Sequence, residues 1–166
     1  MCGKIECYIE AFSKLRTDGN RKTWSTATTF RAPHKPFLLL SVLDLIDAKK
    51  INREFIEPFA ELADRYACYW QKVMESDIIP DMAMPFYDLD REPFWKLVPQ
   101  PEAASRPETI QSLTQLKELY LGAKIDDELF KLCLMEPLRR KLQAALMTTY
   151  FDPATQQILH DFSAGV

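Results

Sequence analysis

The sequence predicts a mainly α-helical, compact domain built around one buried central helix, with one small antiparallel β-hairpin. The first reason is the stretch from residue 37 to residue 46, where eight of ten side chains are apolar, as in a helix that is buried on most sides. The second is the helical spacing of apolar residues in five other segments. The third is a pair of short aromatic runs on either side of a turn. With 166 residues and 47% apolar content, the chain is long enough for one ordinary core.

A first helix is predicted over residues 2–16, because apolar side chains recur there every three to four residues. The turn-forming residues 18–20 end it. Residues 21–29 are rich in hydroxyl groups and poor in core residues, so we predict a surface loop that can hydrogen-bond phosphate. Trp24 stands alone in this loop, and we interpret it as a packing anchor, with base stacking as the alternative.

A basic loop bracketed by prolines, residues 30–36, opens the central helix. Pro36 suits the first helical turn, because its missing N–H would have no partner there. Free backbone N–H groups and the positive end of the helix dipole would then point at the same spot as the side chains of His34 and Lys35. Such a spot attracts an anion, typically a phosphate.

The remainder of the chain predicts more helices and the hairpin. The helices are expected over residues 57–74, 109–121, 126–134 with Asp126 as N-cap, and 137–150. The hairpin has its arms at residues 86–89 and 94–98, around a turn at 90–93. Residues 151–166 show no pattern for packing or for ending a helix. We therefore expect a domain over residues 1–151 and, over residues 152–166, a tail that leads into a further domain.

The charge distribution separates one basic segment from an acidic remainder. The net charge of −3 argues against a generic nucleic-acid binder, whose affinity comes mostly from phosphate neutralisation. From Lys14 to Lys35, however, six basic residues and one acidic residue give +5, which leaves −8 elsewhere. One face could therefore bind an anionic polymer, with a solvated basic segment that has no partner as the alternative.

The composition also bears on location and on chemistry. The apolar runs are shorter than the roughly 20 residues that a membrane helix needs, and the start of the sequence lacks a signal-peptide core, so we expect a cytoplasmic protein without membrane contact. The four cysteines are scattered, which indicates reduced thiols. Only two histidines and four glycines occur, so we expect no catalytic site, no metal and no cofactor.

Four short motifs resemble the N-terminal domain that precedes HNH nuclease domains in bacterial restriction endonucleases. They are Ala32-Pro33-His34-Lys35-Pro36 with the apolar run to residue 40, residues 85–89 with 94–97, residues 125–130, and Tyr150-Phe151. The resemblance runs from about residue 32 to residue 151, and its most specific part surrounds His34. This family includes the sulfur-binding domains of type IV restriction enzymes. The resemblance implies a non-catalytic module of a bacterial defence system that binds phosphorothioate-modified double-stranded DNA and targets a nuclease domain. The sequence leaves open whether the protein forms a homodimer.

The resemblance also implies roles for individual residues. The resemblance implies phosphate or phosphorothioate contacts from His34, Lys35 and Arg106, and a sulfur pocket with Met84, Pro85 and Asp88. The residue pattern itself adds Phe86 as an apolar neighbour in this pocket, and the basic, hydroxyl-rich loop before the central helix adds Arg21, Lys22, Thr29 and Arg31 as candidate DNA contacts. Two positions depart from the family. Met84 replaces an aromatic residue that the family pocket can carry, and Asp88 replaces a small residue. A carboxylate beside a negatively charged sulfur is unfavourable unless it points away.

Elementary chemistry supports such a pocket. Sulfur in place of a non-bridging phosphate oxygen keeps the negative charge but is larger, softer and less strongly hydrated. An apolar lining accepts it at small cost, whereas an oxygen would lose its water hydrogen bonds. The alternatives are a helical domain that reads unmodified or differently modified DNA, a protein-interaction module whose apolar helices seat a partner, and a stand-alone nuclease.

Overall fold

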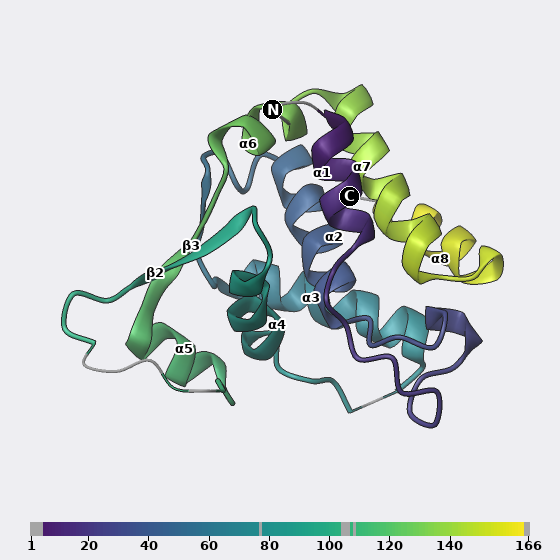
Figure 1. Cartoon of the computed structure of the whole chain (residues 1–166), viewed down its shortest axis with the longest axis horizontal. Helices are drawn as coiled ribbons and strands as arrows, with labels where there is room; N and C mark the ends of the chain where they lie inside the picture. Colours follow the sequence, from purple (N-terminus) through teal and green to yellow (C-terminus); the bar gives the residue numbers. More distant parts are fainter. Residues whose placement is uncertain (1–4, 77, 104–106, 108, 165–166) are drawn as a thin grey trace.

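The computed structural model describes residues 5–76, 78–103, 107 and 109–164. These residues form a mainly helical, compact fold with a small three-stranded antiparallel sheet (Figure 1), so the predicted fold class is confirmed. The α-helices are α1 (Ile5–Ser13), α2 (His34–Asp47), α3 (Ala60–Met74), α4 (Ala83–Asp88), α5 (Leu113–Leu119), α6 (Asp127–Cys133), α7 (Glu136–Tyr150) and α8 (Pro153–Ala164). The 3-10 helices are η1 (Thr26–Thr28) and η2 (Leu89–Arg91), and the strands are β1 (Phe55–Ile56), β2 (Trp95–Pro99) and β3 (Tyr120–Ile125).

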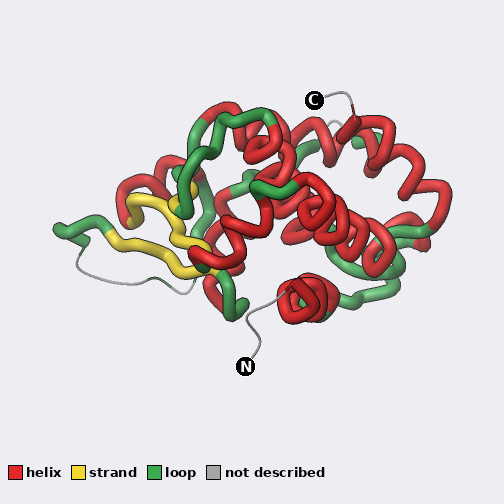
Figure 2. Tube along the Cα trace, turned by 90° about the horizontal axis from the view of Figure 1, so that it is seen from above, coloured by secondary structure: helices red, strands yellow, loops and turns green. Residues whose placement is uncertain are grey.

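Helix α2 is the centre of the core, as predicted. Every residue from Lys35 to Ile46 is buried, which explains why the sequence of this helix is apolar on nearly all sides. Helices α3, α4, α6 and α7 pack against it. Figure 2 shows the strands gathered at one end of the molecule, while helices make up most of the remainder. The first residue of α2, His34, is only half-buried, so this end of the helix reaches the surface.

The sheet differs from the predicted hairpin. Strand β3 lies between β1 and β2 and pairs antiparallel with both, with Lys124 opposite Phe55 on one side and opposite Lys96 on the other. The first predicted arm, residues 86–89, is helical instead. Phe86 and Leu89 are fully buried at a spacing of three residues, and a short aromatic run does not distinguish this arrangement from a strand. The partner of β2 is instead residues 120–125, which overlap the end of the helix predicted over residues 109–121 and fill the gap before the helix predicted from residue 126.

The C-terminal stretch is also corrected. Residues 153–164 form helix α8, which packs against α3 and α7, with Leu159 fully buried. The prediction that this stretch lacks packing is wrong because its few apolar side chains are separated by polar ones that also face the protein. Ser163, for example, donates a hydrogen bond of 2.6 Å to the buried carboxylate of Asp44 in α2.

The other predicted helices are present as α1, α3, α6 and α7, and Asp126 takes the N-cap position of α6.

Cys68 and Cys133 are free thiols, whereas Cys7 is disulfide-bonded, which corrects the prediction of reduced thiols for Cys7. In the part of the chain that is described, no helix is both long enough and apolar enough to cross a membrane.

Candidate functional site

A surface depression of ≈ 260 Å³ lies where the N-terminus of α2 meets the start of α4 and the loop after α1. It brings together five of the residues that the sequence assigned to the site, although they come from two distant segments. These are His34, Lys35, Met84, Pro85 and Asp88. The remaining lining residues are Arg16, Thr17, Asp18, Trp24 and Ala32.

His34 is the first residue of α2, and its half-buried ring packs against two tryptophans. The ring centroids lie 5.6 Å from Trp24, edge-on, and 5.0 Å from Trp70. Burial lowers the pKa of His34 to about 4, although the nearby carboxylate of Asp18 acts in the opposite direction. The ring is therefore neutral at pH 7 and offers one N–H donor and one acceptor. It can hydrogen-bond an anion, but it brings no positive charge of its own.

Lys35 is also held differently from what the sequence suggested. Its Nζ atom lies 2.8 Å from Oε2 of Glu92, and the two side chains are only 8% and 4% exposed. The same oxygen of Glu92 accepts a hydrogen bond of 3.1 Å from the backbone N–H of Arg16. The charge of Lys35 is thus already paired inside the protein, although the residue lines the depression.

The N-terminus of α2 leaves backbone donors at the site. Pro33 occupies the N-cap without a side-chain hydrogen bond, and the N–H of Phe37 bonds the carbonyl of Pro33. Pro36 has no N–H. Within the described residues, the N–H groups of His34 and Lys35 therefore keep no hydrogen-bond partner, as expected for a first helical turn. These groups add the positive end of the helix dipole to the site.

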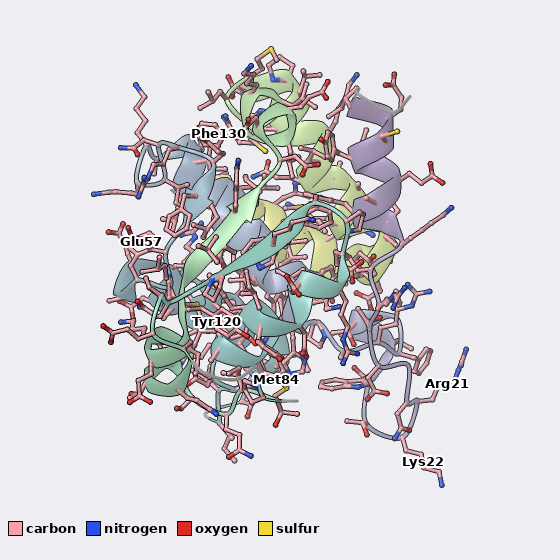
Figure 3. All side chains as sticks on the ribbon, turned by 60° about the vertical axis from the view of Figure 1, so that its left-hand side comes forward. Arg21, Lys22, Glu57, Met84, Tyr120 and Phe130 are labelled. Carbon is pink, nitrogen blue, oxygen red and sulfur yellow. The ribbon has the colours of Figure 1, made fainter. Side chains whose placement is uncertain are left out.

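Met84 and Pro85 of α4 form an apolar part of the wall. Pro85 is buried, while 46% of the Met84 surface is exposed, so a flexible and polarisable thioether faces solvent here. Figure 3 shows Met84 at the surface of the molecule. Phe86, in contrast, is fully buried and packs edge-on against Trp95 at 5.0 Å. It belongs to the core, so its predicted place in the pocket is not what the structure shows.

Two carboxylates line the same depression. The carboxylate of Asp18 is already hydrogen-bonded within its own loop. It accepts hydrogen bonds from Nε1 of Trp24 at 3.0 Å and from the N–H of Asn20 at 3.3 Å. Asp88 is half-buried and lines the depression. The carboxylate that stands where the family has a small residue therefore does lie at the site. Both carboxylates raise the cost of bringing in an anion.

Three predicted basic residues, Arg21, Lys22 and Arg31, do not line the depression. Arg21 and Lys22 are exposed and extend from the loop after α1 (Figure 3), with the guanidinium of Arg21 4.4 Å above the ring of Phe30. Arg31 is exposed above the ring of Tyr150, at 5.7 Å. Within the described residues, these three side chains form no ion pair.

Thr29 and Arg106 are the remaining predicted residues. The hydroxyl of Thr29 donates to the carbonyls of Thr28 at 2.7 Å and Tyr150 at 3.2 Å, so it is used inside the fold. Arg106 lies outside the described residues.

The sequence missed Arg16, Thr17 and Asp18 as lining residues, because the loop after α1 carries no motif. Trp24 is the packing anchor that was predicted, and its edge-on contacts with His34 and Trp70 also make it a wall of the depression. The arrangement suits binding. Within the described residues, no group of three His, Cys, Asp or Glu side chains could hold a metal ion.

A scan against models of protein families finds no match to this chain, and neither does a search of curated proteins.

Proposed function

We propose that this chain binds double-stranded DNA carrying a backbone phosphorothioate and acts as the targeting module of a modification-dependent restriction endonuclease. One observation carries the proposal. His34 and the open N-terminus of α2 line the same depression as the apolar Met84-Pro85 segment of α4. A hydrogen-bonding anion site and an apolar wall therefore meet in one place, which is the combination that a thio-substituted phosphate requires.

The wall supplies the discrimination between sulfur and oxygen. A sulfur placed against Met84 and Pro85 loses little hydration and gains contacts with polarisable atoms. An oxygen in the same position would give up water hydrogen bonds without replacing them. The remaining oxygen of the modified phosphate can accept hydrogen bonds from His34 and from the N–H groups of the first turn of α2.

The positive charge for DNA comes from the exposed arginines and Lys22, since Lys35 is paired with Glu92. Arg21, Lys22 and Arg31 are exposed and can contact the backbone, while Arg16 sits in the lining itself. These contacts have to outweigh the repulsion from Asp18 and Asp88. Binding should therefore weaken steeply as salt is raised.

Fluorescence anisotropy tests the proposal with three duplexes of one sequence, which carry no sulfur, a single Rp phosphorothioate or a single Sp phosphorothioate. We expect one stereoisomer to bind at least about tenfold more tightly than the unmodified duplex, because one apolar wall can accept the sulfur in only one orientation. Equal affinity for all three duplexes would contradict the sulfur assignment.

Equal but clear binding would instead support a domain that reads unmodified or otherwise modified DNA. The presence of Asp18 and Asp88 in the lining favours this second candidate, because a carboxylate can accept hydrogen bonds from base amino groups. The same titrations decide between the two.

A further inference from the structure

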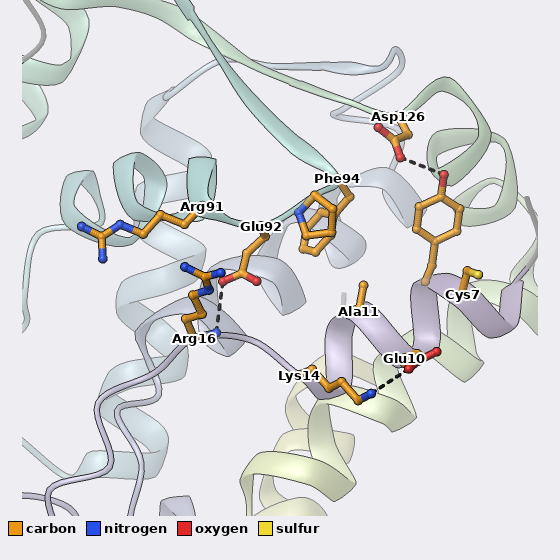
Figure 4. Close-up of a pocket in the computed structure, with 11 residues that line it drawn as sticks. Cys7, Glu10, Ala11, Lys14, Arg16, Arg91, Glu92, Phe94 and Asp126 are labelled. Atoms are coloured by element: carbon orange, nitrogen blue, oxygen red, sulfur yellow. Dashed lines mark hydrogen bonds and ion pairs between the residues drawn. The ribbon is translucent and has the colours of Figure 1, made fainter. Parts of the chain in front are cut away.

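Figure 4 shows a second and larger depression, of ≈ 490 Å³. It is formed by α1, the start of the following loop, and the segment that joins η2 to β2. Arg16 lines both depressions. A ligand that is bound in the first depression and extends along Arg16 therefore reaches the second depression.

The wall between the two depressions is the buried ion pair. Lys35 lines the first depression and Glu92 lines the second, and their charged atoms are 2.8 Å apart. Because both side chains are almost fully buried, this wall is fixed, and the spacing of the two depressions is a property of the folded core.

The carboxylates of the second depression already have partners. Glu10 pairs with Lys14 at 2.7 Å, and Asp126 accepts a hydrogen bond of 2.9 Å from the hydroxyl of Tyr8. Glu92 is held by Lys35. None of these carboxylates therefore needs a ligand to satisfy it.

Two cations of the second depression have no such partner. Within the described residues, the guanidinium groups of Arg16 and Arg91 make no ion pair and no hydrogen bond, and both side chains are exposed. Figure 4 shows both arginines on the same side of the depression, with the side chain of Arg16 near Glu92 and that of Arg91 extending away from Glu92, whereas Asp126 lies on the opposite side. The end of the second depression that adjoins the first is therefore positively charged.

We propose that Arg16 and Arg91 bind the backbone phosphate that neighbours the modified phosphate on the same DNA strand. This inference rests on the proposed function. Phosphates follow one another along a strand with a rise of about 3.4 Å per nucleotide, so a strand anchored in the first depression brings its next phosphate past the shared wall. Arginine suits this role because its planar fork can donate two parallel hydrogen bonds to phosphate oxygens.

Neutral backbone links give a direct test. A series of duplexes, each with the favoured phosphorothioate, replaces one flanking phosphate at a time by an uncharged methylphosphonate. For the unaltered protein, one of the adjacent positions should cost roughly tenfold in affinity. For the double variant Arg16→Ala/Arg91→Ala, the same replacement should cost nothing further, because the contact is already lost. The salt dependence of log K should also become shallower by about 1.

Arg53→Ala is the matched control, because Arg53 is an exposed arginine that lines neither of these depressions. It should keep the full sensitivity to methylphosphonate. Thermal melting of each variant checks the fold, which exposed side chains should not disturb.

The outcomes separate this inference from the proposed function. If the double variant keeps the same methylphosphonate profile and the same salt slope as the unaltered protein, the assignment of Arg16 and Arg91 is overturned while sulfur recognition stands. If the unaltered protein does not distinguish sulfur from oxygen, the proposed function fails, whatever the arginines do. A protein that binds no DNA overturns both.

Discussion

Lys35 and Glu92 form a buried ion pair with 2.8 Å between Nζ and Oε2. The pair joins the first turn of α2 to the segment between η2 and β2, and the same carboxylate oxygen holds the backbone of Arg16. Three segments that line the two depressions therefore meet at one carboxylate. The sequence assigned Lys35 to phosphate binding, but in the structure this lysine forms a buried ion pair that connects two segments of the fold.

Removing one member of this pair should destabilise the fold strongly. Lys35→Met leaves the Glu92 carboxylate buried without its cation, so we expect a loss of about 3 kcal/mol or more in the free energy of unfolding. The double variant Lys35→Met/Glu92→Leu should recover much of this loss, because it leaves no unpaired charge. Urea unfolding measures both variants. A loss below about 0.5 kcal/mol for Lys35→Met would show that the pair is not buried in solution.

The stability of the protein should depend on the protonation of His34. Its pKa is lowered from 6.5 to about 4 in the fold, so the neutral ring is favoured by folding. This contribution is complete above pH 6.5 and is lost as the pH falls towards 4, by at most about 1.4 kcal/mol for each pH unit. Urea unfolding at pH 4.5, 5.5 and 7 should show a smaller pH dependence for His34→Gln than for the unaltered protein. Identical pH dependence for both proteins would contradict the burial of His34.

The thioether of Met84 should contribute to sulfur preference. Met84→Gln keeps the length of the side chain but adds polar atoms, so the preference for the favoured phosphorothioate should fall roughly fivefold while affinity for the unmodified duplex changes little. Met135→Gln is the control, because both methionines are 46% exposed and Met135 does not line the depression. Anisotropy titrations give both affinities. An equal loss for the two variants would argue against a specific role for Met84.

Gly122 should be needed for the sheet. A Cβ atom at this position would collide with the carbonyl oxygen of Ile56 and would lie 2.8 Å from Cζ of Phe55. Gly122→Ala should therefore cost about 2 kcal/mol or more, since β1 has to move away from β3. Gly19→Ala should be nearly neutral, because no atom lies within 4 Å of the added methyl group. Thermal melting compares the two, and equal melting temperatures would refute the predicted clash.

The buried carboxylate of Asp44 should hold α8 in place. It pairs with Arg65 of α3 at 2.9 Å, accepts hydrogen bonds from Tyr69 and Ser163, and is contacted by Gln143 of α7 at 3.3 Å. Ser163→Ala removes the contact that α8 makes with Asp44, together with a hydrogen bond of 3.2 Å that Ser163 accepts from Gln143, so we expect a loss of about 1 kcal/mol. Amide hydrogen exchange should become faster in α8 before it does in α2.

Thr148→Ala serves as the control for Ser163→Ala. The hydroxyl of Thr148 is exposed and bonds only a carbonyl of its own helix, so its loss should leave exchange in α8 unchanged. Faster exchange in α8 for both variants would show that the effect of Ser163→Ala is not specific to Asp44.

The sequence was sufficient for the main features of the fold. A helix that is apolar on nearly every side has to be buried, so α2 could be placed at the centre without coordinates. Helices α1, α3, α6 and α7 followed from the spacing of their apolar residues. The open N-terminus of α2, with His34 beside it, could also be predicted, because Pro36 marks the first turn.

Strand pairing and side-chain partners were decided only in three dimensions. The partner of β2 is β3, far along the chain, and a local aromatic pattern carries no information about such a contact. The pairing of Lys35 with Glu92 is of the same kind, because the charge of a lysine is visible in a sequence but its burial against a distant carboxylate is not. For the site, the sequence predicted an anion-binding spot near His34, and the resemblance implied that Met84 and Pro85 lie beside it; the structure brings these residues to one depression. Only the structure shows that Lys35 is paired with Glu92, whereas the guanidinium groups of Arg16 and Arg91 make no ion pair within the described residues.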